Sequence, residues 1–389
     1  MVSKVKNLLF IVEKIGPYHN SRFNYLSKFK EFKIFVLETD TESKRYLWEE
    51  ARNAEYTIYK IKKNQQGYKK FADINDQIIE ILSLSNPKLI FITGWYEKIH
   101  HFLIYISYFK KIPIIIMSDS RNRDYKRIFY KELIKRILLK GFSSGIVAGK
   151  ESADYLMKLN FKESYIFKPL DVVDNTFFRT QSTNKNVYSN YFLCIARFIK
   201  VKNYKNLLKG FEIYKAKGGN FNLLIIGSGP EENLINEFKN KSKFSNSIFL
   251  ESWTNTGLLP EYYKKAKATV LASTKETWGL VINESMASGT PCIVSKNCGC
   301  YLDLIEEAKT GWGFDPNNAI ELSSLFLKVE RIKQTKLSKM RKNIKSKINK
   351  FGLDNFKLAV DEAIENSLNN RKYSLMSSIL AYILFKIKS

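Results

Sequence analysis

Residues 268–294 decide the fold, because they contain one complete repeat of an alternating strand and helix pattern. The stretch reads ATVLASTKETWGLVINESMASGTPCIV. A buried strand, 268–272, leads through a polar loop into a helix that carries Glu284, and a Gly-x-Pro turn leads into the next strand. Short continuous apolar strands on either side of a helix are typical of a parallel sheet covered on both faces. The stretch therefore predicts an α/β domain.

The same alternation continues on both sides of this stretch. Further strands are predicted at 8–12, 33–37, 56–60, 89–92, 112–117, 145–148, 191–195, 223–226 and 247–250. A polar segment interrupts the pattern near 180–190. We therefore expect two Rossmann-like, doubly wound domains that face a central cleft. The predicted boundaries are a first domain at 1–178, a linker at 179–190, a second domain at 191–365 and a C-terminal helix or tail at 366–389 that packs back on the first domain or on a membrane.

Composition limits the function classes. The 389 residues carry 64 Lys and Arg against 38 Asp and Glu, a net charge of +26, and 44% are hydrophobic. Such a charge favours polyanions, which include nucleic acid, anionic lipid and phosphorylated small molecules. A biased composition, rich in Lys, Ile and Asn, explains the charge equally well. No stretch is long and apolar enough to span a bilayer, and 1–6 carry no signal-peptide pattern, so a cytoplasmic protein is expected.

Metal and redox chemistry are not expected. The Cys298 and Cys300 pair is too closely spaced for the usual zinc motif, and no histidine lies near it in sequence. The remaining cysteines are Cys194 and Cys292, and the histidines are His19, His100 and His101. We therefore expect reduced thiols, no metal site and no cofactor.

The loop before the helix that carries Glu284 has the chemistry of a sugar phosphate site. Gly279 lets the backbone approach a ligand closely, and the free N–H groups of a helix start favour an anion such as a diphosphate. Glu276 and Glu284 would repel phosphate, but they are suited to accept hydrogen bonds from sugar hydroxyls. The alternative is an ordinary amphipathic helix with two solvated glutamates.

With the loop, the helix and the Gly-x-Pro turn in register, the chain resembles the family 4 retaining glycosyltransferases of the GT-B fold. Glu276 and Glu284 have the E-x7-E spacing of that family, and 275–280 and 284–291 match its E-G-F-G-L and E-A-M-A-x-G-x-P segments. The resemblance implies a catalytic role for Glu276. It implies donor binding by Glu284, Thr277, Trp278, Gly279 and Leu280.

A second match lies between the strand at 191–195 and the next helix. Arg197 and Lys202 have the spacing of the G-R-x4-K motif of that family, with Ala196 in place of its glycine. The resemblance assigns both cations to the donor diphosphate, whose negative charge grows at the transition state, so that they do the work of a divalent metal. For Lys202 taken alone, a solvated lysine is the alternative.

Weaker matches complete the set of candidate residues. Gly227 and Gly229 stand in the G-x-G-P of the family and are expected at the donor, unless they only shape a turn. Asp119 replaces a histidine that many members have near the sugar, with a helix cap or turn as the alternative. His19 and Gly16 are candidates for contact with the acceptor or a phosphate, with a turn or interface histidine as the alternative.

The resemblance implies a metal-independent retaining hexosyltransferase (EC 2.4). It would move a sugar from a nucleoside diphosphate sugar, UDP first and GDP next, to a glycan or lipid-linked saccharide. This transfer would serve bacterial surface polysaccharide assembly, such as lipopolysaccharide or capsule. The first domain would hold the acceptor and the second the donor. A front-face displacement is expected, in which the departing diphosphate takes the acceptor proton.

Three segments, 99–111, 125–140 and 375–385, mix basic with aromatic and aliphatic residues. They are suited to an anionic membrane surface, as in peripheral attachment to the inner face of the cytoplasmic membrane. Helices that pack on the sheet are the alternative.

Two other functions remain open: a nucleotide-sugar epimerase of the same fold, and a basic protein that binds nucleic acid or a membrane surface. The sequence carries no nucleic-acid-binding module, so no specific nucleic acid partner is expected.

Overall fold

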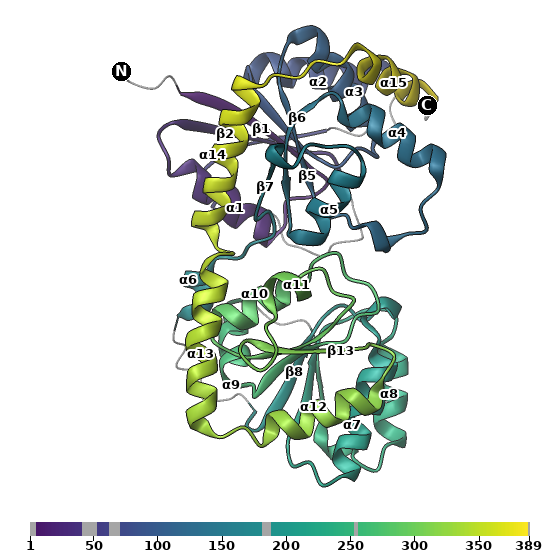
Figure 1. Cartoon of the computed structure of the whole chain (residues 1–389), viewed down its shortest axis with the longest axis vertical. Coiled ribbons are helices and arrows are strands. Elements are labelled where there is room, and N and C mark those ends of the chain that lie inside the picture. Colours follow the sequence, from purple (N-terminus) through teal and green to yellow (C-terminus); the bar gives the residue numbers. More distant parts are fainter. Residues whose placement is uncertain (1–4, 41–52, 62–70, 181–187, 253–255, 388–389) are drawn as a thin grey trace. The chain divides into compact units, whose positions relative to one another are not determined.

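A computed structural model describes the chain over residues 5–40, 53–61, 71–180, 188–252 and 256–387 (Figure 1). The chain forms two compact units. The first unit consists of Met1–Ala148, Ser152–Val172 and Leu353–Ser389, and the second consists of Gly149–Glu151 and Val173–Gly352. Each unit is built on its own sheet, and all the strand pairs are parallel.

The sheet of the first unit has the strand order β3-β2-β1-β4-β5-β6-β7. Its strands are β1 (Lys6–Val12), β2 (Phe32–Glu38), β3 (Thr57–Lys60), β4 (Leu89–Thr93), β5 (Ile114–Ser118), β6 (Phe142–Val147) and β7 (Ile166–Phe167). Its helices are α1 (Pro17–Ser27), α2 (Phe71–Ser85), α3 (Lys98–Lys110), α4 (Phe129–Leu139), α5 (Lys150–Lys158), α14 (Leu353–Asn369) and α15 (Leu375–Ile387), with short 3-10 turns at Asn122–Asp124 and Glu163–Tyr165.

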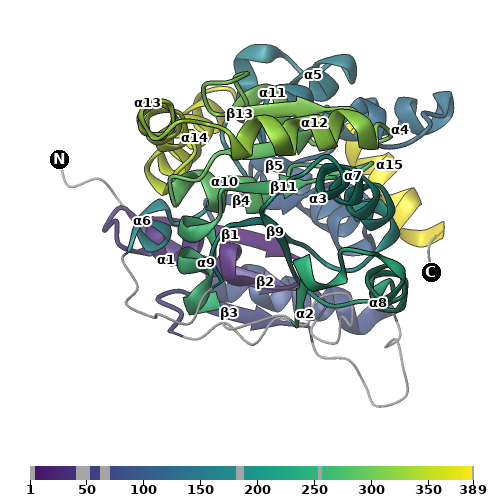
Figure 2. The same cartoon turned by 90° about the horizontal axis from the view of Figure 1, so that it is seen from below.

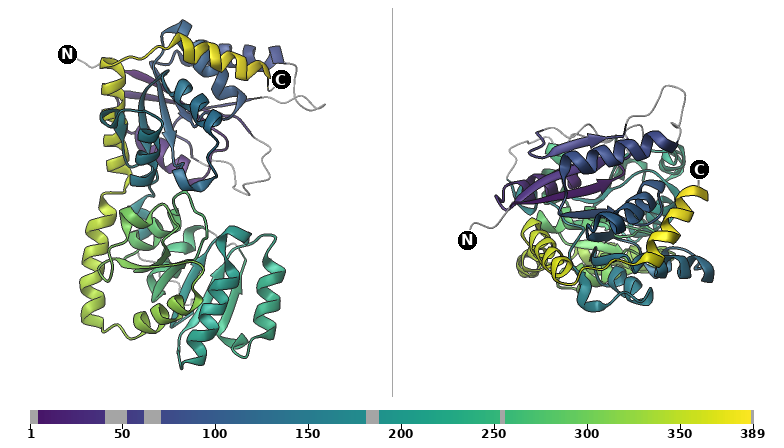
Figure 3. Two further views of the ribbon diagram at one scale, coloured as in Figure 1. Left: turned by 45° about the vertical axis from the view of Figure 1, so that its right-hand side comes forward. Right: turned by 90° about the horizontal axis from the view of Figure 1, so that it is seen from above.

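The first sheet is buried on both faces, which explains its continuous apolar strands. Leu8 to Val12 are at most 1% exposed. One face packs against α2, α3, α4, α5 and α15, and the other packs against α1 and α14. Figure 3 shows α14 and α15, both yellow, on this unit.

The sheet of the second unit has the order β10-β9-β8-β11-β12-β13. Its strands are β8 (Tyr191–Ile195), β9 (Asn222–Ile226), β10 (Ile248–Glu251), β11 (Ala268–Leu271), β12 (Cys292–Ser295) and β13 (Gly311–Phe314). Its helices are α6 (Asn175–Arg179), α7 (Tyr204–Ala216), α8 (Glu232–Lys241), α9 (Leu259–Lys265), α10 (Leu280–Ala287), α11 (Tyr301–Leu304), α12 (Ala319–Glu330) and α13 (Gln334–Asn349), with 3-10 turns at Lys200–Lys202, Ser245–Ser247 and Thr256–Leu258. The core on one face of this sheet is closed by α7, α8 and α12 (Figure 2).

Both sheets reverse their strand order once, and this reversal creates a switch point in each. In the first unit it lies between β1 and β4, and in the second between β8 and β11. The loops that leave two strands on either side of such a point diverge, and ligands of doubly wound sheets bind there, beyond the carboxyl ends of the strands. The prediction of two doubly wound parallel sheets is confirmed.

The two units divide the chain differently from the predicted boundaries. The first unit ends at Val172 rather than 178, and the chain returns to it at Leu353, so 353–365 lie outside the unit to which they were assigned. The return has a physical cause: Phe356, Val360 and Ala363 on α14 are at most 1% exposed in the core of the first unit. Of the predicted linker, 181–187 lie outside the described residues. The helix at the C-terminus, α15, packs on α3 and α4.

Of the basic and aromatic segment 125–140, only the part from Phe129 to Leu139 is helical, as α4. Asp124 accepts hydrogen bonds from the backbone and the guanidinium of Arg121, which holds this part of the chain in a turn. Among the described residues, no helix combines the length and hydropathy that crossing a membrane requires.

Candidate functional site

The loops after β8 and β11 are joined at the switch point of the second unit. Because these strands are neighbours, the loops meet: the backbone N–H of Thr274 donates to the carbonyl of Val201 at 2.8 Å. The side-chain amide of Asn203 donates to the carbonyls of Ala272 and Pro316, at 3.0 and 2.8 Å. Asn203 itself adopts a left-handed backbone, with φ of 62°, which starts α7. Sequence analysis missed this residue, although asparagine is common in that conformation.

Lys202 and Glu276 form an ion pair across these two loops. Their side chains are 15% and 18% exposed, and the hydroxyl of Ser273 donates to the same carboxylate at 3.2 Å. The structure therefore brings together two predicted site residues that lie 74 positions apart in sequence. The pair places a cation and a hydrogen-bond acceptor side by side, and each reduces the charge that the other presents to a ligand. Arg197 is exposed on the loop after β8.

The loop from Glu276 to Gly279 is also held by backbone hydrogen bonds from the segment that follows β12. The backbone N–H of Gly299 donates to the carbonyl of Glu276 at 3.0 Å, and that of Cys300 donates to Trp278 at 3.1 Å. Gly279 has a φ of 110°, and a Cβ there would lie 2.8 Å from Leu271. Only glycine suits this position, from which α10 begins. The backbone at the start of α10 is thereby held in one conformation.

Glu284 lies in α10 and is 2% exposed. Its carboxylate accepts a hydrogen bond from the hydroxyl of Tyr263 on α9. Tyr263 is fully buried, so it fixes the position of Glu284 from inside the unit. Sequence analysis did not single out Tyr263, because nothing local links α9 to α10. Thr277 and Leu280 are partly exposed at the two sides of Gly279.

Trp278 is 2% exposed, and its indole N–H donates to Asn283 at 2.9 Å. Its ring lies 5.8 Å from that of Phe351, centroid to centroid. These contacts give Trp278 a packing role that shapes the loop. Donor binding by Trp278 stays a prediction.

Gly227 and Gly229 shape a turn, which was the alternative interpretation. A Cβ on Gly227 would lie 2.0 Å from the carbonyl oxygen of Ala196, and one on Gly229, whose φ is 144°, would lie 2.8 Å from that of Phe198. The backbone N–H of Phe198 donates to Ser228 at 2.7 Å. The two glycines therefore allow the loop after β9 to pack on the loop that carries Arg197.

In the first unit, Gly16 and His19 lie at the start of α1, after β1, and Asp119 follows β5. The residue that sequence analysis missed is Arg22, which is 6% exposed and donates to the carbonyl of Leu170 at 2.8 Å. Its guanidinium nitrogen Nη1 lies 4.0 Å from the carboxylate oxygen Oδ1 of Asp171. Arg22 is the one charged residue of α1, and this position could have been singled out from the sequence.

The charges around Arg22 act on one another. Burial lowers the pKa of Arg22, while Asp171 and Asp119 oppose this effect. Burial and, second, the positive charge of Arg22 lower the pKa of His19 to about 3. The imidazole of His19 is therefore neutral at physiological pH. It can exchange a hydrogen bond with an uncharged hydroxyl but offers no positive charge to a phosphate.

Within the described part of the chain, no three His, Cys, Asp or Glu residues gather as metal ligands. All four cysteines are buried, and none of them forms a disulfide. Burial raises the pKa of Cys194 and Cys292 to about 12, so both thiols stay protonated. The site in the second unit thus consists of two cations, two carboxylates and a helix start.

Comparison with known proteins shows similarity to glycosyltransferases in the part of the chain that contains these residues. Residues 176–350 match the family model described as "Glycosyl transferases group 1". The alpha-monoglucosyldiacylglycerol synthase of Acholeplasma laidlawii is 27% identical over 190 residues, which are 45% of this chain and 46% of that protein. The chain spans about half the length of the curated relatives it matches.

Solved structures agree over nearly the whole chain. A glycosyltransferase from Rickettsia africae superimposes with a TM-score of 0.76 at 16% identity, over 94% of this chain and 99% of that one. The Anabaena protein HepE, solved with UDP, gives 0.73 at 13% identity, over 92% and 99%. The fold is therefore the GT-B fold.

Proposed function

We propose that the chain, whose residues 176–350 match the family model of the glycosyl transferases group 1, transfers a sugar from a nucleoside diphosphate sugar to an acceptor. The observation that carries this proposal is the pairing of Lys202 with Glu276 at the switch point of the second sheet. That is the place where doubly wound sheets bind nucleotides. The matched region contains every residue of this site.

The residues divide the work of binding by charge. The start of α10, Arg197 and Lys202 hold the diphosphate and stabilise the negative charge that develops as it departs. Glu276 and Glu284 accept hydrogen bonds from hydroxyls of the donor. When the donor arrives, Lys202 exchanges part of its contact with Glu276 for the diphosphate, which frees the carboxylate for a sugar hydroxyl. The transfer retains the anomeric configuration, and the departing diphosphate takes the acceptor proton.

Uridine diphosphate is the carrier that we propose first. The support is the similarity to a structure solved with UDP, and GDP is the second candidate. The acceptor is a glycan or lipid-linked saccharide, or a lipid itself. The support is that one relative is named a synthase of monoglucosyldiacylglycerol and another a capsular polysaccharide glycosyltransferase. We place the enzyme in the cytoplasm at the inner face of the membrane. In the first unit, neutral His19 and Asp119 contact the acceptor hydroxyl.

Thermal unfolding with nucleoside diphosphates tests the donor site. The wild type, Glu284→Ala and the control Glu237→Ala, whose side chain is 71% exposed on α8, are heated with UDP, GDP and ADP. A ligand at 100 times its dissociation constant adds about 2.7 kcal/mol to the free energy of unfolding. We expect one base to raise the midpoint of wild type and Glu237→Ala but not of Glu284→Ala. No rise with any nucleotide would refute the donor site.

Product analysis separates transfer from the epimerase alternative. With the preferred nucleotide sugar, a transferase releases nucleoside diphosphate in proportion to the acceptor that is glycosylated. An epimerase releases nucleoside diphosphate and a rearranged free sugar with no acceptor present, and that result would replace the proposal.

A further inference from the structure

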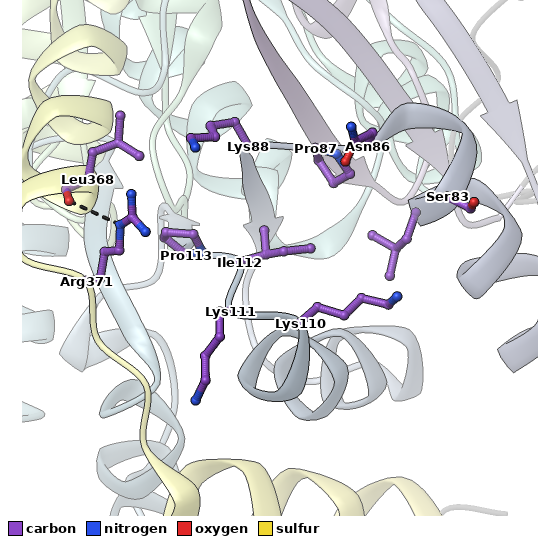
Figure 4. A pocket seen from close by; sticks show the side chains of 11 residues that line it. Ser83, Asn86, Pro87, Lys88, Lys110, Lys111, Ile112, Pro113, Leu368 and Arg371 are labelled. Carbon is purple, nitrogen blue, oxygen red and sulfur yellow. Dashed lines mark hydrogen bonds between the residues drawn. The ribbon is translucent and has the colours of Figure 1, made fainter.

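A cavity of about 500 Å³ opens at the amino edge of the first sheet. It lies where Lys88 leads into β4 and Pro113 leads into β5, at the edge opposite to Asp119 (Figure 4). Its lining is more polar than apolar and includes Ser83 and Asn86, but five apolar residues contribute to it: Leu82, Pro87, Ile112, Pro113 and Leu368. The proposed sugar transfer makes no use of this cavity.

Four basic side chains also line the cavity: Lys88, Lys110, Lys111 and Arg371. Among the described residues that line it, none is acidic. The guanidinium of Arg371 is anchored on the carbonyl of Leu368 at 3.3 Å, and the ammonium of Lys111 lies 4.4 Å from the ring centre of Tyr108. All four basic residues are exposed, and their charges have the same sign, so this part of the surface attracts anions. The cavity therefore suits a phosphate group.

The helix α15 starts next to this cavity, and several of its large apolar side chains are exposed to solvent. The hydroxyl of Tyr373, just before α15, donates to the carbonyl of Lys111 at 2.8 Å. Against α3 and α4, the helix buries small residues, Ser377, Ser378 and Ala381, together with Phe385. A helix on the surface of a protein in water turns its large apolar side chains inward.

Leu380 and Leu384 also pack against the core of the first unit, but other large apolar side chains of α15 are exposed. Leu375, Met376, Ile379, Ile383 and Ile387 are 45–74% exposed, and the sequence of α15 has a single charged residue, Lys386. The neighbouring helix α4 adds Phe129, Tyr130 and Leu133, at 81%, 59% and 45%. Exposed apolar surface on this scale marks an interaction surface.

We propose that the cavity binds the phosphate headgroup of an anionic phospholipid while the outer face of α15, with Phe129 of α4, lies in the bilayer interface. The lining of the cavity fits this ligand, because its cations meet the phosphate and its apolar residues meet the glycerol and first methylenes. The cations and the apolar stripe are adjacent, which is the combination that holds proteins on anionic membranes. The proposal does not depend on sugar transfer.

Vesicle sedimentation tests the cavity. Full-length protein is pelleted with vesicles of equimolar phosphatidylcholine and phosphatidylglycerol, and with phosphatidylcholine alone. The triple variant Lys88→Gln/Lys110→Gln/Arg371→Gln is compared with Lys336→Gln/Lys339→Gln/Lys342→Gln, which removes the same charge from exposed positions of α13. We expect the cavity variant to bind the anionic vesicles at least about tenfold more weakly than the α13 variant. Equal binding by the two variants would overturn the proposal.

The apolar stripe is tested with Ile379→Ser/Ile383→Ser, and its control is Leu234→Ser/Ile320→Ser, which changes exposed residues of the second unit. We expect the α15 variant alone to lose vesicle binding. Both sites are exposed, so circular dichroism and the nucleotide-dependent thermal shift should be those of the wild type. A loss of vesicle binding with an intact nucleotide shift therefore concerns the membrane surface and leaves the donor site unaffected.

Two further results would assign the surface to another ligand. If millimolar glycerol 3-phosphate displaced the wild type from vesicles and the α15 variant still bound them, the cavity would be a site for a soluble phosphate. If analytical ultracentrifugation without vesicles showed a dimer that Ile379→Ser/Ile383→Ser dissociated, α15 would be an interface between copies of this chain. Either result would overturn the proposal.

Discussion

At the scale of single residues, the candidate site depends on side chains that interact with one another. Lys202 forms an ion pair with Glu276, and Ser273 donates to the same carboxylate, so removing one member changes the surroundings of the others. Arg22 acts in the same way on His19, whose pKa it helps to lower. Replacing a residue of either cluster should therefore change activity or stability in a way that replacing a solitary surface charge would not.

Replacing Lys202 with Met should lower kcat/KM for sugar transfer by about 10²–10³-fold, because one cation that stabilises the departing diphosphate is lost. The control is Lys205→Met, which removes a nearby exposed lysine of α7. Steady-state kinetics with the preferred donor measures both. If the two variants lost activity equally, the effect would be one of overall charge rather than of the ion pair.

Replacing His19 with Gln should make the first unit less sensitive to acid. The pKa of His19 is about 3 when folded and 6.5 in its ordinary state, so the unfolded chain binds a proton that the folded chain does not as the pH falls below 6.5. Stability from the neutral imidazole is thus present above pH 6.5 and is lost toward pH 3, by at most about 1.4 kcal/mol per pH unit. Urea unfolding near pH 7.5 and near pH 5 measures the difference, and equal losses in wild type and variant would contradict it.

At the scale of elements, α14 completes the first unit from a distant part of the sequence. It buries one face against β5, β6 and β7, and its Ile364 is 3% exposed. The side chain of Ser144 in β6 donates to the carbonyl of Ala363 at 3.1 Å. The first unit is therefore not a continuous segment, and its stability depends on residues after 352.

Ile364→Ala should lower the free energy of unfolding of the first unit by about 2–5 kcal/mol, as expected when a large aliphatic side chain is removed from a packed core. Leu358→Ala on the same helix is the matched control, because the side chain of Leu358 is 54% exposed. It should lower the free energy of unfolding by much less than Ile364→Ala. Denaturant unfolding followed by circular dichroism compares them. Similar losses would mean that α14 is not packed as described.

At the scale of the whole molecule, the chain has two separately closed sets of cores, one for each sheet. The proposed donor residues all lie in the second unit, and His19 and Asp119 lie in the first. A nucleotide that binds only the second unit stabilises that unit directly by mass action.

Calorimetry should therefore resolve two unfolding transitions. The preferred nucleoside diphosphate should raise the midpoint temperature of only one of them. The Ile364→Ala variant identifies the other, because its substitution lies in the first unit and should lower only that transition. A single transition that moves as a whole with nucleotide would show instead that the two units unfold together.

Several parts of the site were predictable because they are local. Gly279, Glu276 and Glu284 lie within nine residues, and their spacing along one loop and helix indicates a binding loop. Tyr263, Asn203 and Arg22 were missed because their partners come from other elements. Gly227 and Gly229 were expected at the donor or in a turn, and only the structure shows that the backbone of Ala196 and Phe198 lies too close for a larger residue there.

The sequence by itself determined the buried strands, the helix starts and the chemical character of the site loops, because each depends on neighbouring residues along the chain. Only the tertiary structure decided that β8 lies beside β11, which joins Lys202 to Glu276, and that α14 belongs to the first unit. It also decided that α15 buries Ser377, Ser378 and Ala381 and leaves Leu375, Met376, Ile379 and Ile383 exposed. The physical reason is that apolar periodicity shows that a face must be covered, while the shape and free hydrogen-bonding groups of distant elements select what covers it.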